Sequence, residues 1–112
     1  MAHTFAAQLE QFTCQAGVLA EGDGCSLVPA ATREVQVWAE ADFATEPPMG
    51  IVVEVLSTTC VLVQMTGTTP DLWSGLTRGA IYYADDAGAI ATTGTVVVGV
   101  APTESALTLQ MG

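Results

Sequence analysis

Short apolar runs rich in Val, Ile and Thr recur from Ser26 onward, and turn residues separate them. Residues 51–56 and 60–65 alternate with the period of two that is typical of strands, and the three residues between them complete a hairpin. Further runs follow at 80–84 and 95–101. No segment of this part of the chain shows the 3.6-residue period of an amphipathic helix. The sequence therefore predicts an all-β fold, a small β-barrel or sandwich of short antiparallel strands.

The first 20 residues differ from the rest of the chain. Phe5, Leu9 and Phe12 follow the spacing i, i+4, i+7 of an amphipathic helix. Two turns of isolated helix are marginal in water, so an extended arm that orders on a partner is the alternative. We expect residues 1–20 to form an N-terminal arm or short helix, residues 21–112 to form the β-domain, and these three apolar side chains to contact a neighbouring subunit.

Few charged residues are available to cover the surface. The 112 residues suffice for one domain with one modest core, and only 12% of them are charged, against about 25% in ordinary soluble domains. Thr, Ser, Gly and Ala must then form much of the surface, which suits burial against other chains. Self-association, or a place in a larger assembly, is predicted; a secreted Thr/Gly-rich β monomer is the alternative.

Most of the charged side chains are negative. The chain contains twelve carboxylates and two basic residues, Arg33 and Arg78, which gives a formal net charge of −10. A chain of this charge repels phosphate backbones and anionic lipid, so neither nucleic acid nor membrane is an expected partner. The start of the chain lacks the pattern of a signal peptide, and synthesis in the cytoplasm is expected.

The cysteines give a limited signal. Cys14, Cys25 and Cys60 are odd in number and lack the spacing of a zinc site. Cys60 lies in an apolar strand pattern and is expected to be a buried thiol. Cys14 and Cys25 are either reduced thiols or a disulfide pair.

The side chains that carry catalysis are scarce. The single histidine, His3, lies near the N-terminus, lysine is absent, and no nucleotide-binding or metalloprotease motif occurs. Asp85 and Asp86 are adjacent, so their carboxylates diverge instead of facing each other across a cleft. We expect no enzymatic activity, no catalytic residue, no cofactor and no metal.

Aromatic residues are more often used for packing or interfaces than for ligand stacking. Trp38 and Trp73 are predicted to lie at subunit contacts, and a sugar-stacking platform is the alternative. Tyr82 and Tyr83 are neighbours in a strand, so one is expected in the core and the other at the surface.

Several turn and strand motifs occur in an order found in one class of proteins. They are Gly75-Leu76-Thr77-Arg78-Gly79, the pair Tyr82-Tyr83, the turn Asp85-Asp86-Ala87-Gly88, and the strand Val98-Gly99-Val100-Ala101. With the preceding hairpin, residues 35–112 resemble a β-module of tailed-bacteriophage virion proteins, which recurs in capsid decoration (cement) proteins and in head and tail fibres.

The resemblance implies a structural virion protein that binds the outer surface of the assembled capsid, with the major capsid protein as its partner. Such proteins commonly form homotrimers, so the same is expected here. The acidic charge suits the outside of a capsid, away from packed DNA. The alternative is a tail or neck adaptor, or a receptor-binding fibre module with a glycan contact near Trp38 or Trp73. The chain lacks long repetitive segments, which favours the decoration protein.

Overall fold

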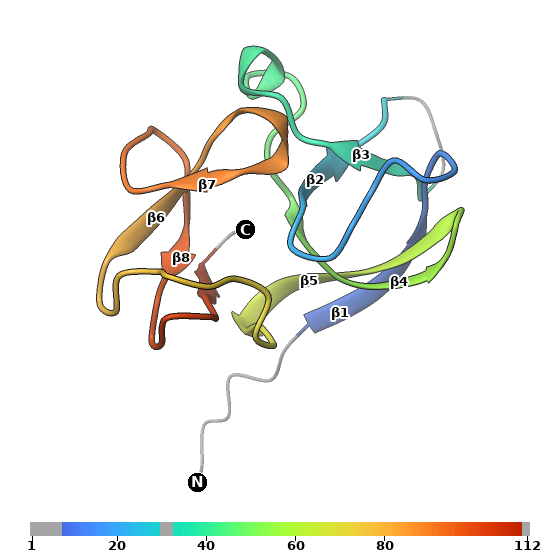
Figure 1. Ribbon diagram of the computed structural model, residues 1–112. Helices are drawn as coiled ribbons and strands as arrows, with labels where there is room; N and C mark the ends of the chain where they lie inside the picture. Colours follow the sequence, from blue (N-terminus) through green and yellow to red (C-terminus); the bar gives the residue numbers. More distant parts are fainter. Residues whose placement is uncertain (1–7, 30–32, 111–112) are drawn as a thin grey trace, which may run out of the picture.

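The strands expected from the sequence form one antiparallel sheet that curves into a half-barrel (Figure 1). The computed structural model describes residues 8–29 and 33–110. The all-β prediction is confirmed, since the only helical elements of these residues are two short 3-10 turns. The elements, in chain order, are β1 (Gln8–Thr13), β2 (Gly24–Leu27), β3 (Val35–Val37), η1 (Glu40–Asp42), β4 (Gly50–Ser57), β5 (Cys60–Thr68), β6 (Ile81–Ala84), η2 (Asp86–Gly88), β7 (Ile90–Ala91), β8 (Val97–Val100) and β9 (Thr108–Gln110).

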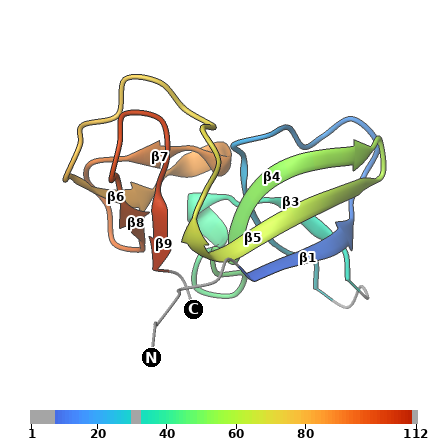
Figure 2. The same ribbon diagram turned by 90° about the horizontal axis from the view of Figure 1, so that it is seen from below.

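The order of strands in the sheet is β3-β2-β4-β5-β9-β8-β6-β7, and β1 also pairs with β5. Figure 2 shows β1 to β5 gathered on one side and β6 to β9 on the other. The long strand β5 joins the two halves, because its last residues pair with β9, with Gly67 opposite Leu109. The predicted hairpin is present as β4 and β5, with Val55 opposite Val61.

Strand β4 has a buried side chain on each face at residues 51 and 52. Ile51 and Val52 are both fully buried, and as neighbours in a strand they point in opposite directions. Each belongs to a different hydrophobic cluster, so the single core expected from the chain length is divided into two. The Trp38 cluster contains Trp38, Ile51, Tyr82, Ala84, Val98, Ala101, Leu107 and Leu109. The Phe12 cluster contains Phe12, Cys14, Leu19, Cys25, Val35, Val52, Val61 and Val63.

Trp38 occupies a closely fitted site in the first cluster. Its indole N–H donates to the carbonyl of Asp85 at 2.7 Å, and its ring meets Phe43 edge to face at 6.4 Å between centroids. Gly24 lies beneath the indole, and a Cβ atom there would come within 2.2 Å of the six-membered ring. The position of the Trp38 ring therefore requires glycine at residue 24 and the carbonyl of Asp85 in the turn after β6.

The helix expected near the N-terminus is wrong for the residues that the structure describes. Residues 8–13 form strand β1, which pairs along β5 with Phe12 opposite Val61. In the strand, Leu9 and Phe12 lie on opposite faces: Leu9 is 42% exposed, and Phe12 is buried in the second cluster at 6%. Pairing with β5 satisfies backbone groups and buries an aromatic ring, which an isolated two-turn helix cannot do.

Arg33 fixes the outer side of β1. Its guanidinium donates to the carbonyl of Gln11 at 2.6 Å and lies 4.9 Å from the centre of the Phe12 ring. The backbone N–H of Thr13 donates to the carbonyl of Arg33 at 2.8 Å. β1 is thus held on both sides within its own chain, as part of the sheet.

Candidate interaction surfaces

The five residues predicted for subunit contacts do not form one surface. Phe5 lies outside the described residues. Phe12 and Trp38 are buried, at 6% and 0% exposure, so the expectation that they present surface to a partner is wrong for the folded chain. Leu9 is exposed on β1. Trp73 is half-buried and packs against the Trp38 cluster from the segment before β6.

Trp38 lies one residue beyond strand β3. β3 ends at Val37, and the chain then turns into η1. The indole consequently leaves the alternation of the strand and points into the core, where burying an aromatic ring contributes most to stability.

A different apolar surface is formed by the outward side of β6 to β9. Cross-strand pairs join Tyr83 to Ala91 on one side and to Val97 on the other, and join Ile81 to Val100. Val100 in turn pairs with Thr108. We call this surface the uncharged face; it consists of Ile81, Tyr83, Ala91, Val97, Val100 and Thr108.

The two adjacent tyrosines divide as predicted, with one in the core and one at the surface. Tyr82 is buried, whereas Tyr83 is half-exposed on the uncharged face. The hydroxyl of Tyr82 accepts a hydrogen bond from the backbone N–H of Thr77 at 2.8 Å, which fixes the turn before β6. The alternation in this strand was the one signal in the sequence that pointed to the uncharged face.

An apolar groove lies between the end of β2, residues 45–49, and the first residue of β1. Its volume is about 490 Å³. Glu46 is the one charged side chain in its lining, which otherwise consists of Gln8, Leu27, Pro29, Thr45, Pro47, Pro48, Met49, Met65 and Thr66. Most of these side chains are apolar, so the groove offers mainly a contact surface.

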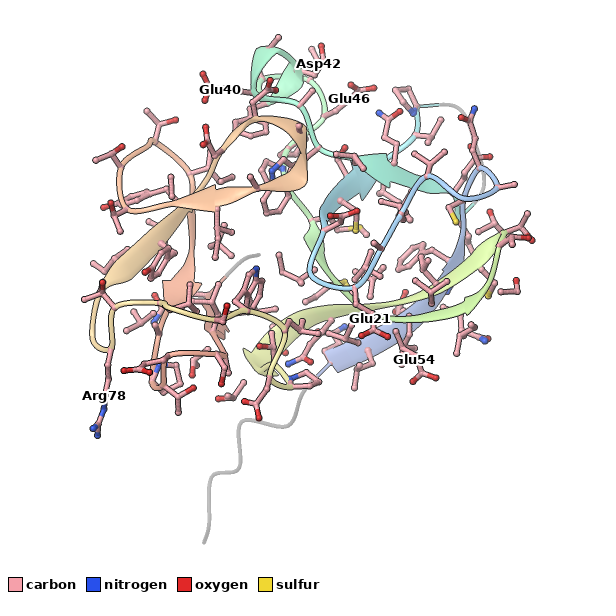
Figure 3. All side chains as sticks on the ribbon, in the orientation of Figure 1. Glu21, Glu40, Asp42, Glu46, Glu54 and Arg78 are labelled. Atoms are coloured by element: carbon pink, nitrogen blue, oxygen red, sulfur yellow. The ribbon has the colours of Figure 1, made fainter. Side chains whose placement is uncertain are left out.

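The carboxylates are spread around the molecule. Figure 3 shows three carboxylates in or just after η1, namely Glu40, Asp42 and Glu46, and it shows Glu21 and Glu54 elsewhere in the fold. Asp86 has a structural role, because its carboxylate accepts a hydrogen bond from the backbone N–H of Glu40 at 3.1 Å. Within residues 8–29 and 33–110, no three His, Cys, Asp or Glu side chains are grouped as a metal site requires.

All three cysteines are free thiols. Cys14 and Cys25 are buried, whereas Cys60 is only partly buried, so the expectation of a buried Cys60 is wrong. The Cys25 thiol donates to the carbonyl of Gly50 at 3.6 Å. Burial, and to a smaller extent the Asp23 carboxylate, raises the pKa of Cys25 from 9.0 to about 12. A thiol that stays protonated to such a pH is a poor nucleophile.

The described part of the chain contains no helix with the length and apolar character needed to cross a membrane. No protein-family model, curated protein or solved structure matches this chain.

Proposed function

We propose that this protein is a structural component of a tailed-bacteriophage virion that binds the outer surface of the assembled capsid and stabilises it as a homotrimer. Its partner is the major capsid protein, and its role is non-enzymatic. The observation that carries the proposal is the uncharged face on a strongly acidic chain. The chain has a net charge of −10, yet strands β6 to β9 contain no charged residue.

An uncharged apolar face on an acidic chain suits a protein that meets other subunits at that face and solvent elsewhere. Uncharged apolar area is buried without desolvating carboxylates, whose transfer out of water is costly. The remaining acidic surface keeps the assembled particle soluble and is unfavourable near packed DNA. The resemblance over residues 35–112 leads to the same class of protein.

The stabilising mechanism is thermodynamic linkage. A protein that binds only the assembled shell lowers the free energy of that state by mass action. When three copies act as one unit, several weak contacts combine through a high effective concentration. No covalent step and no bound cofactor is needed.

The alternative role as a glycan-binding fibre module has less support. A sugar platform needs exposed aromatic faces, and the Trp38 ring is fully buried. Of the two tryptophans, only Trp73 retains partial exposure.

Two measurements test the proposal. In purified particles of the phage that encodes this chain, quantitative mass spectrometry should find a copy number comparable to that of the major capsid protein. Capsids assembled without the chain should lose their contents at a lower temperature, and adding the purified protein should restore the difference. A few copies located at the tail would favour the adaptor, and complete absence from particles would overturn the proposal.

A further inference from the structure

We infer that the uncharged face is the surface through which copies of this chain contact one another. The inference rests on the self-association that is part of the proposed function, and it assigns that contact to β6, β7, β8 and β9.

The uncharged face is built on a rigid support. Its side chains form two rows across paired strands, one centred on Tyr83 and the other on Val100. The opposite side of the same strands holds Tyr82, Val98 and Leu109 in the Trp38 cluster. Thr108 is further tied to Thr68 by a hydroxyl–hydroxyl hydrogen bond of 2.8 Å. A contact surface of this kind loses little conformational entropy when a partner binds.

Two large apolar side chains of this surface are exposed to solvent. Ile81 is 47% exposed and Val97 is 38% exposed. Tyr83 lies between them, and tyrosine with aliphatic neighbours is a composition enriched at the centres of protein interfaces. Charged side chains are depleted at such centres, and none occurs in the strands that form this surface.

Charge identifies the occupant as a second copy. Two molecules that each carry −10 repel wherever their carboxylates approach. No side chain of the uncharged face is itself charged, and Asp85 and Asp86 lie beside it in the turn between β6 and β7. Contact centred on this face therefore leaves the carboxylates at its edge. A basic partner would gain no electrostatic attraction there and would bind an acidic part of the surface instead.

Arg78 supplies a positive charge near the uncharged face. Of the two arginines, Arg33 pairs with Glu10 at 3.5 Å. Arg78 lies three residues before Ile81 and extends into solvent (Figure 3). Among the described residues it has no ion pair within its own chain. A neighbouring copy offers carboxylates to this cation, so contacts at the rim add attraction to an apolar centre.

The test compares two single substitutions that add the same charge. Val97→Asp places a carboxylate on the uncharged face, and Leu56→Asp adds one to β4 at a residue of similar exposure, 40% against 38%. Sedimentation velocity over a range of concentrations should show self-association of the wild type and of Leu56→Asp. Association of Val97→Asp should be weaker by about 30-fold or more, as expected when a contact of hot-spot strength is lost.

Circular dichroism and the urea midpoint of each variant report folding. If Val97→Asp fails to fold, Val97→Thr keeps the β-branched shape and replaces one methyl group with a hydroxyl, and it should weaken association less. A monomeric wild type, or a Val97 variant that folds and associates as Leu56→Asp does, overturns the inference. Capsid binding is measured on the same samples. If copies associate through another surface and capsid binding is normal, only this inference is refuted. If copies associate through this face and do not bind capsids, only the proposed function is refuted.

Discussion

Gly24→Ala is expected to destabilise the protein because the new methyl group meets the Trp38 indole. The added Cβ would lie within 2.2 Å of Cζ2 and Cη2 of the ring and 2.3 Å from Cζ3. Gly24 does not have a positive φ, so alanine is compatible with its backbone and the effect is steric. The ring cannot move away freely, since it is fully buried and its N–H is bound to Asp85 at 2.7 Å.

The expected cost has two parts. Overpacking of a buried site typically costs about 1–3 kcal/mol. A shift of the indole that breaks its hydrogen bond leaves a buried donor unsatisfied, at about 1–3 kcal/mol. We expect Gly24→Ala to lower the free energy of unfolding by about 2–4 kcal/mol, a large part of the roughly 5–15 kcal/mol typical of a domain. Urea unfolding followed by circular dichroism measures the change directly.

A double-mutant cycle with Trp38→Phe isolates the clash. The phenyl ring is smaller than the indole, so the methyl group that Gly24→Ala introduces should cost much less in that background. Gly75→Ala is a second control, because no atom lies within 4 Å of the position of its added Cβ, although its φ of +75° adds backbone strain. The reasoning is refuted if Gly24→Ala costs under about 0.5 kcal/mol, or if the cost is equal with Trp and with Phe at residue 38.

Two further predictions concern the Phe12 cluster. Phe12→Ala should cost about 3–5 kcal/mol in urea unfolding, because it leaves a cavity in a core, whereas Leu9→Ala on the exposed side of β1 should be nearly neutral; equal effects would contradict the observed faces of the strand. The second concerns pH. Because folding raises the pKa of Cys25 from 9.0 to about 12, its thiol ionises first in the unfolded chain. The associated stability is fully present below pH 9 and is lost as pH rises from 9 toward 12. Over that range the stability of the wild type should fall more steeply with pH than that of Cys25→Ala, and parallel pH profiles for the two proteins would show that the thiol is not protected.

The hairpin and the later strands were predictable because local patterns and tertiary structure agree there. Residues 51–56 and 60–65 alternate in β-branched residues, and three turn residues separate them. β1 shows no such pattern: its two faces carry Gln8, Glu10 and Phe12 on one side and Leu9, Gln11 and Thr13 on the other. Its conformation is decided by the open edge of β5, a long-range partner that local propensity does not reveal.

The candidate interface was only partly predictable, because the size and apolar character of a residue do not distinguish a contact residue from a core residue. Trp38 and Phe12 are large enough to fill the core and do so. The smaller Ile81 and Val97 remain at the surface, and they form a patch only through the pairing of β6 with β8. Proximity across strands depends on register, which composition does not determine.

The two sides of β4 have a consequence for cooperativity. Ile51 and Val52 belong to different clusters, so neither cluster can open without disturbing the strand that completes the other. The halves of the molecule are therefore expected to unfold together as a single unit. Amide protons of residues 50–53 should exchange at the rate of global opening. A mutation that destabilises one half should therefore destabilise the whole chain.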